Sequence, residues 1–280
     1  MTRYILALLV GSITFFGCED VIDVDVPTAQ SRLVVEASLD WEKGTIGNAQ
    51  SIALSMSTPF FDTDQNTRVT GAIVRVINQD SGEVFPFNDN NDGTYSTSSF
   101  VPILNDTYRL EILYNGETYE ATETLMSVSD INEVNQSIEG GFDDELLELN
   151  LYFTDPANIE NFYLIKYEVE GDLFPYLEDV SDEFTDGNEI HDFLEKEDDE
   201  DGEEVPFEAG NVVNISLYGI SEQYYNFIRL LIEQHGSQGD PFSSNAAQIR
   251  GNCINTSNPD NYAFGYFRLT EKDTATYTFE

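Results

Sequence analysis

Residues 107–122 (TYRLEILYNGETYEAT) are the stretch that most directly predicts the fold. Before Asn115-Gly116, apolar and aromatic residues alternate with Arg109 and Glu111, which is the period of a half-buried strand. An Asn-Gly pair between two such runs is the strongest short hairpin signal, because a type I′ turn needs positive φ at both central residues. The stretch therefore predicts an antiparallel β-hairpin.

Similar runs continue toward the N-terminus. β-branched and apolar residues dominate 33–39, 52–56 and 71–77, and shorter runs surround Phe85 and Tyr95. Turn sequences at 80–82 and 91–93 separate them. Six or seven short strands with frequent turns predict an antiparallel β-sandwich, immunoglobulin-like or transthyretin-like, over residues 32–126.

A second β-rich domain is expected over residues 142–280, after a polar boundary at 126–141. Apolar residues alternate with polar ones in 147–153 and 163–169, and further strands are predicted at 211–218, 261–269 and 274–279. We thus predict a mainly β protein whose second domain contains one or two helices.

The clearest helix follows Ser221, which can cap its N-terminus. Tyr224, Phe227, Ile228 and Leu231 then share one apolar face at i, i+3, i+4 and i+7 spacing. This stripe is expected to dock on the second domain's sheet.

Residues 170–208 carry 18 acidic residues against Lys196 and His191. Because dense like charge resists packing, we interpret this segment as an acidic loop insertion. The whole chain has 280 residues and a formal net charge of −41. Such a charge disfavours nucleic acid and anionic membrane surfaces as partners. It suits a soluble exposed body, a cationic partner or divalent cations.

The N-terminus resembles a bacterial lipoprotein signal. Arg3 precedes an apolar run that ends at Gly17-Cys18, and the run is too short to cross a bilayer as a helix. We expect residues 1–17 to be a signal peptide, Cys18 to be lipidated and residues 18–31 to form an acidic tether. The alternative is an ordinary secretory signal with an incidental cysteine.

Glu19 and Asp20 follow that cysteine directly. They resemble the export signal that brings Bacteroidota lipoproteins to the cell surface, although a solvated acidic linker would have the same composition. The expected location is the outer membrane, lipid-anchored and facing the cell surface, with the periplasmic leaflet as the alternative.

No catalytic motif is recognisable. The sequence lacks Gly-x-Ser-x-Gly, a phosphate-binding Walker loop and His-Glu-x-x-His. With Cys18 lipidated, Cys253 is the only other cysteine, and we expect it in or near the core. We therefore predict a protein that binds, with no catalytic residues and no required cofactor.

Two weak candidate sites lie in the acidic insertion. Glu197, Asp199, Asp201 and Glu208 occupy positions 1, 3, 5 and 12 of a calcium-loop pattern, with Gly202 at position 6. Glu at position 1 departs from the pattern, and so dense an acidic run matches parts of it by chance. Phe174 and Tyr176 are the aromatic residues most expected to be exposed for ligand binding.

The chain as a whole resembles the Bacteroidota outer-membrane lipoproteins grouped as domain of unknown function 4249. The matching segments are 33–37 (LVVEA), 71–76 (GAIVRV), 93–95 (GTY), 108–112 (YRLEI), 249–252 (IRGN) and 265–267 (GYF). The resemblance implies a lipoprotein found beside TonB-dependent transporters, and it carries over no catalytic residue.

The first functional hypothesis is an accessory subunit of an outer-membrane β-barrel such as a TonB-dependent transporter, held to the membrane by its lipid. The second is a surface adhesion or structural module that binds divalent cations through its acidic loop, with Ca²⁺ as the candidate cation. The third is a carbohydrate-active enzyme.

Overall fold

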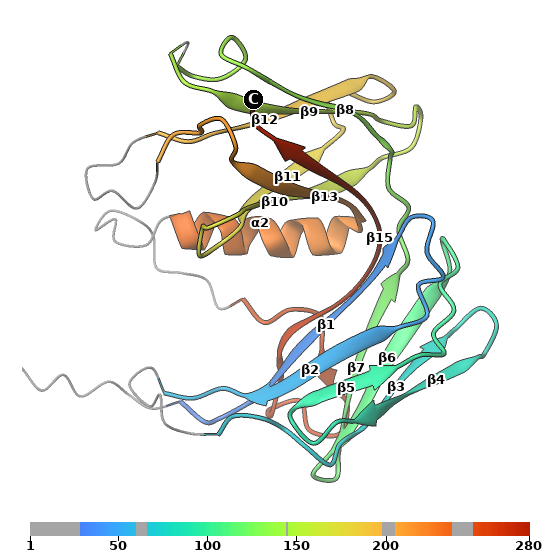
Figure 1. Ribbon diagram of the computed structural model, residues 1–280. Coiled ribbons are helices and arrows are strands. Elements are labelled where there is room, and N and C mark those ends of the chain that lie inside the picture. The colour runs from blue at the N-terminus through green and yellow to red at the C-terminus, as the bar shows by residue number, and fades with distance from the viewer. Residues whose placement is uncertain (1–28, 60–65, 144, 198–204, 237–248) are drawn as a thin grey trace, which may run out of the picture. The chain divides into compact units, whose positions relative to one another are not determined.

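The hairpin predicted from Asn115-Gly116 is present. In the computed structural model, β6 (Thr107–Tyr114) pairs antiparallel with β7 (Glu117–Thr124) (Figure 1). Asn115 and Gly116 have φ angles of 49° and 80°, as a type I′ turn requires. Every second residue of β6, from Tyr108 to Ile112, is fully buried, which is the alternation that the sequence predicted.

The structure describes residues 29–59, 66–143, 145–197, 205–236 and 249–280. Within these residues it contains fifteen strands and one α-helix, so the mainly β fold class is confirmed. Residues 31–280 form one unit by their internal contacts. No helix of the described residues has the length and apolar character needed to span a bilayer.

The first sandwich is built mostly from the N-terminal half of the chain. Its strands are β1 (Leu33–Glu42), β2 (Gln50–Met56), β3 (Ile73–Asn78), β4 (Val84–Asp89), β5 (Thr94–Thr97), β6, β7 and the short β14 (Ile254–Asn255). They follow the order β1-β2-β5-β4-β3-β6-β7-β14. Phe100 packs between Phe85 and Tyr108, with ring centroids 5.1 and 5.3 Å away, in the centre of its core.

One long strand, β15 (Phe264–Thr278), belongs to both sandwiches (Figure 1). Its first part pairs parallel with β1, from Phe264 opposite Val34 to Lys272 opposite Glu42. Its second part pairs antiparallel with β13 (Val212–Ile220). The sequence predicted two separate strands here. They are continuous because the pairing with β1 ends at Lys272, opposite Glu42, and the pairing with β13 begins at the same residue, opposite Tyr218.

The chain preceding β15 also belongs to the first sandwich. Cys253 and Ala263 are buried in its core, and β14 pairs with β7. The Glu117 carboxylate accepts hydrogen bonds from the side chains of Asn255, Asn258 and Asn261. These hydrogen bonds, of which the one from Asn258 has the largest effect, lower the pKa of Glu117 to about 2. The C-terminal segment is therefore fastened to the hairpin.

The second sandwich has two facing sheets. One contains β11 (Tyr176–Ser181), β10 (Phe162–Val169), β13 and the end of β15, and the other contains β12 (Glu189–Glu195), β9 (Glu148–Thr154) and β8 (Ile131–Ser137). Phe153 and Tyr163 meet edge to face between them, with ring centroids 4.9 Å apart. The shared core also includes Leu151, Ile165 and Leu217.

The predicted helix is α2 (Glu222–Gly236). The Ser221 hydroxyl accepts a hydrogen bond from the Tyr224 amide at 3.1 Å, which caps the N-terminus as expected. Tyr225 and Ile228 pack with Leu164, Tyr218 and Tyr266 on the sheet of β10, β13 and β15. Of the predicted stripe, Tyr224, Phe227 and Ile228 thus cover a sheet face, whereas Leu231 is 37% exposed.

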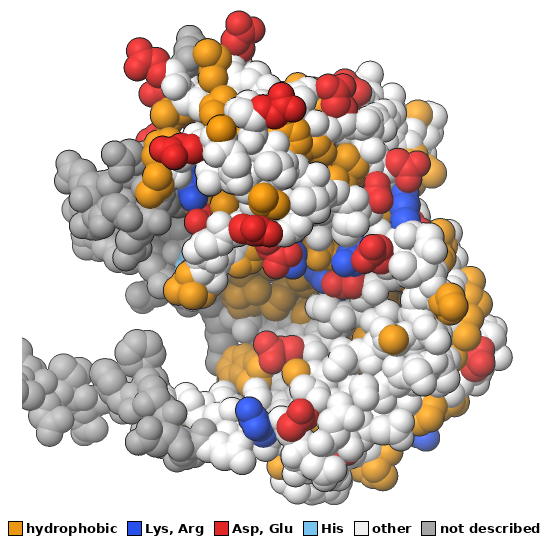
Figure 2. Space-filling model, in the orientation of Figure 1, with side chains coloured by type: hydrophobic (Ala, Val, Ile, Leu, Met, Phe, Trp, Pro, Cys, Tyr) orange, Lys and Arg blue, Asp and Glu red, His pale blue; other side chains and the backbone are white. Residues whose placement is uncertain are grey.

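The interpretation of residues 170–208 as a loop insertion is wrong for two stretches of the segment, because β11 and β12 lie within it. Alternation explains the error: Ile190 and Leu194 are buried in the core, whereas Glu189 and His191, on either side of Ile190, are exposed. Figure 2 shows acidic side chains spread over the visible face with few basic ones among them. Strands tolerate this charge density because only one side of each is packed.

We predict that Gly265→Ala destabilises the protein by roughly 3 kcal/mol, because the added Cβ would overlap the Val35 carbonyl in the β1–β15 ladder. Its φ of 96° adds strain for any L-residue. Gly71→Ala is the matched control: its φ is 78° but no atom lies within 4 Å of the added Cβ. Chemical denaturation should show a loss of about 1 kcal/mol for the control. Equal losses for the two variants would contradict the close β1–β15 approach.

Candidate functional site

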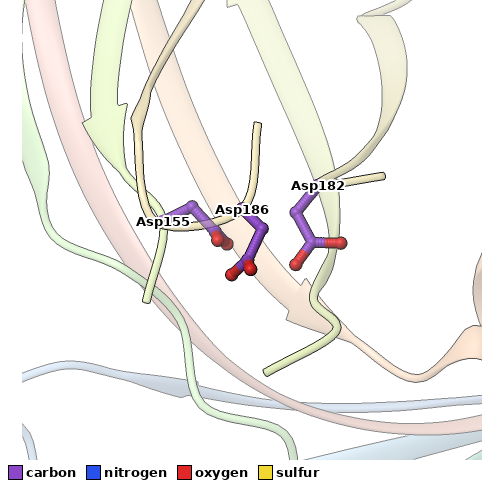
Figure 3. Close-up of side chains that lie close together, drawn as sticks. All are labelled: Asp155, Asp182 and Asp186. Carbon is purple, nitrogen blue, oxygen red and sulfur yellow. The ribbon is translucent and has the colours of Figure 1, made fainter. Parts of the chain in front are cut away.

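Three aspartates converge at one end of the second sandwich (Figure 3). Asp155 directly follows β9, and Asp182 and Asp186 lie in the connection from β11 to β12. One carboxylate oxygen from each lies within 4.8 Å of the others. Asp155 and Asp182 are only 2% and 3% exposed, whereas Asp186 faces solvent.

Hydrogen bonds from the surrounding loops hold these carboxylates in place. Asp155 accepts from the Tyr163 hydroxyl at 2.7 Å and the Gly187 amide at 3.0 Å. Asp182 accepts from the Asn161 amide at 2.9 Å, and Asp186 from the Asn158 amide at 2.6 Å. Burial, with the neighbouring Asp155, raises the pKa of Tyr163, so its hydroxyl remains a donor. The cluster thus ties the β9–β10 and β11–β12 connections together.

Carboxylate oxygens are the ligands that Ca²⁺ and Mg²⁺ prefer, so Asp155, Asp182 and Asp186 are the described residues that could hold a divalent cation. The sequence did not single them out. Asp182 and Asp186 are two among 18 acidic residues of one segment, and Asp155 precedes that segment by many residues. Only the folding of the two connections against each other brings them together.

The calcium-loop candidates are not part of this cluster. Glu197 and Glu208 are both exposed, and the Glu208 amide donates to the Asn211 side chain at 2.8 Å. Asp199 and Asp201 lie outside the described residues. The structure therefore offers the Asp155 cluster as a different candidate for a cation.

The two aromatic ligand-binding candidates differ in their surroundings. Phe174 is 71% exposed, and its neighbour Leu173 is 85% exposed. Tyr176 is half-buried against the second core, and its hydroxyl donates to Asp172 at 3.2 Å. Phe174 is therefore available to a partner, whereas most of Tyr176 serves packing.

Another exposed aromatic residue lies in the second sandwich, at the end of β9 opposite to Asp155. Phe142, in the β8–β9 connection, is 85% exposed. Its amide donates to the Glu195 carboxylate, and the next residue, Lys196, forms an ion pair with Asp172 at 2.8 Å. Glu195 and Lys196 thus hold the β8–β9 connection and the β10–β11 connection, respectively.

We use the name loop-tip surface for the three exposed apolar residues of these connections, Phe142, Leu173 and Phe174.

The side chains most suited to catalysis are engaged in structure. Burial raises the pKa of the Cys253 thiol to about 12, so it stays protonated. The His191 ring stacks on Tyr152 at 4.6 Å, and its Nε2 lies 2.6 Å from Asn150 Oδ1. Burial raises the pKa of the Asp192 carboxyl, which accepts the Tyr167 hydroxyl.

The residues proposed for lipidation and export, Cys18, Glu19 and Asp20, lie outside the described residues. The comparison with protein families covers the chain from the residue after Cys18 onward. The model of a domain of unknown function, DUF4249, matches residues 19–276. The chain belongs to this family. The family membership expected from the short matching segments is thereby confirmed for the DUF4249 protein, and the Bacteroidota lipoprotein assignment stays a prediction.

A search of curated proteins found no match to the DUF4249 protein. Solved structures resemble it only as β folds. A DUF4785 family protein from Legionella pneumophila is 12% identical, with a TM-score of 0.26 over 68% of this chain and 53% of that one. The DUF4249 chain thus spans about half of that protein. A two-domain fibronectin type III segment of chicken tenascin is 11% identical, with a TM-score of 0.22 over 70% and 89% of the two chains.

We predict that Asp186→Asn raises the melting temperature in a chelator-containing buffer, because it removes one of three mutually repelling charges while keeping an acceptor for the Asn158 amide. Glu183→Gln, an exposed acid of the same connection outside the cluster, is the control. Differential scanning calorimetry checks both. A lower melting temperature for Asp186→Asn in chelator would contradict the repulsion.

Proposed function

We propose that the DUF4249 protein is a lipid-anchored binding protein of the outer membrane, exposed at the cell surface. In this proposal it serves as an accessory subunit of a TonB-dependent transporter or a similar β-barrel. The loop-tip surface is the observation that carries the proposal: Phe142, Leu173 and Phe174 are 85%, 85% and 71% exposed.

Large apolar side chains exposed on folded connections are typical of protein-binding surfaces. Burying them against a partner would stabilise a complex by roughly 25 cal/mol per Å² of apolar area removed from water. The connections that carry them are fixed by Glu195 and Lys196, so less conformational entropy is lost on binding. These features favour recognition of a folded partner.

Acidic residues surround the loop-tip surface. Asp143, Glu145 and Glu170 are exposed beside it, and the chain as a whole carries a formal charge of −41. A suitable partner would combine an apolar socket with basic residues around its rim, since complementary charge increases association rates and selects partners. A bare anionic membrane surface lacks that complementarity.

The N-terminal sequence supports the membrane location in this proposal. Residues 18–31 would link a lipidated Cys18 to β1, and at full extension they reach about 50 Å. Binding is favoured over catalysis because the thiol of Cys253 and the ring of His191 are both committed to packing and hydrogen bonding.

The test is co-purification from detergent-solubilised outer membrane. We expect a stoichiometric β-barrel with the wild-type protein and at least a tenfold loss of it with the double variant Leu173→Ser, Phe174→Ser, because the variant removes two anchors. Ile73→Ser is the matched control: Ile73 is 62% exposed but lies on β3 of the first sandwich.

Two results would contradict the proposal. One is the absence of any stoichiometric barrel with the wild-type protein, and the other is equal recovery with all three proteins. A Cys18→Ser variant separates anchoring from recognition, because it should leave the membrane fraction yet still bind the purified barrel.

A further inference from the structure

A cavity of about 400 Å³ lies beside the connection from β1 to β2, away from the loop-tip surface. Its wall is formed by the end of β1, by residues 45–50 and by Lys272 of β15. The volume is at the lower end of the range of small-molecule sites, which is suitable for a single side chain or a small metabolite.

The wall of the cavity is held in one conformation. Trp41 Nε1 donates to the Thr45 carbonyl at 3.0 Å across the connection. Gly47 has a φ of 69°, and a Cβ there would lie 2.5 Å from Trp41 and 2.8 Å from Pro102. Only glycine fits this close approach, so the cavity is largely preformed.

The polar donors of the wall are used within the protein. Gln50 Nε2 donates to the carbonyls of Asp40 and Gly47, both at 3.0 Å. Asn48 Nδ2 donates to the Ser98 carbonyl at 2.9 Å, and the Thr45 hydroxyl donates to the Glu42 carbonyl at 2.7 Å. Lys272 Nζ forms an ion pair with Glu42 Oε2 at 3.3 Å.

The acceptors of the wall are used much less. Among the described residues, no donor is hydrogen-bonded to Gln50 Oε1 or Asn48 Oδ1, although Gln50 is only 8% exposed. Asp40 accepts Arg268 Nη2 at 2.6 Å through one carboxylate oxygen only. The cavity therefore presents two amide oxygens and the second carboxylate oxygen of Asp40, beside the Glu42–Lys272 ion pair.

We propose that this cavity binds a guanidinium or primary ammonium group, carried either by a small amine or by an arginine or lysine side chain of a partner. Such a group supplies the several N–H donors that the unused acceptors lack, among them the second carboxylate oxygen of Asp40. An anion would meet these acceptor oxygens, with Lys272 already paired with Glu42. The site goes beyond the proposed transporter role, since it lies on the first sandwich and does not involve the loop-tip surface.

The chain offers a built-in reporter for this site, because Trp41 is its only tryptophan and lies behind the cavity wall. Titration of the full-length protein with agmatine, and separately with the blocked peptide Gly-Arg-Gly, should change tryptophan fluorescence saturably. Binding of either probe supports the proposal: agmatine indicates a small amine, and the peptide alone indicates a partner side chain. Added salt should weaken the binding.

Glu42→Gln should raise the dissociation constant about tenfold, because a charge-assisted hydrogen bond is lost. Glu36→Gln is the matched control, since Glu36 is an exposed acid on the same strand that does not line the cavity. The melting temperatures of both variants show that each remains folded. No saturable signal with either probe, or equal weakening by the two variants, would overturn the proposal, as would equally tight binding of the neutral analogue glycerol.

Discussion

The parallel pairing of β15 with β1 is the interaction on which the rest of the structure depends. β15 pairs with β1 through its first part and with β13 through its second, so a single strand supplies side chains to both hydrophobic cores. Parallel pairing requires a long connection, and here nearly the whole chain lies between the two partners. The two sandwiches are consequently one hydrogen-bonded structure instead of two domains joined by a linker.

This arrangement determines where recognition can occur. Most of the apolar side chains of β1 and β15 are buried, so both strands serve structure. The features proposed for binding lie on connections at the ends of these strands and at the far end of the second sandwich. The β1–β2 connection forms the cavity beside Lys272, and the β8–β9 and β10–β11 connections form the loop-tip surface. The sheets thus support two kinds of connection: the β1–β2 connection with a polar cavity, and the β8–β9 and β10–β11 connections with exposed apolar side chains.

Local sequence was sufficient for local structure. The Asn115-Gly116 hairpin and the capped helix after Ser221 were both predicted, because their turn, capping and periodicity signals lie within a few residues. The acidic strands β11 and β12 were not predicted, because the high acidic content of residues 170–208 was given more weight than the short alternation of apolar and polar residues within them. Exposure of Phe174 was correctly expected from its acidic surroundings.

Features that depend on distant residues could not be predicted. The β1–β15 ladder joins the two ends of the chain, and nothing in either strand alone specifies the other as its partner. Asp155 meets Asp182 and Asp186 only when two connections fold together. The kind of ligand proposed for the cavity depends on which side-chain donors of its wall are already hydrogen-bonded, and only the structure shows those hydrogen bonds.

The most direct test of the shared-strand account is native-state hydrogen exchange over a range of low denaturant concentrations. If β15 unites the two cores, the slowest amides of β6 in the first sandwich and of β9 in the second should report the same opening free energy and the same dependence on denaturant. A sandwich that opens while the other keeps its full protection would contradict the account.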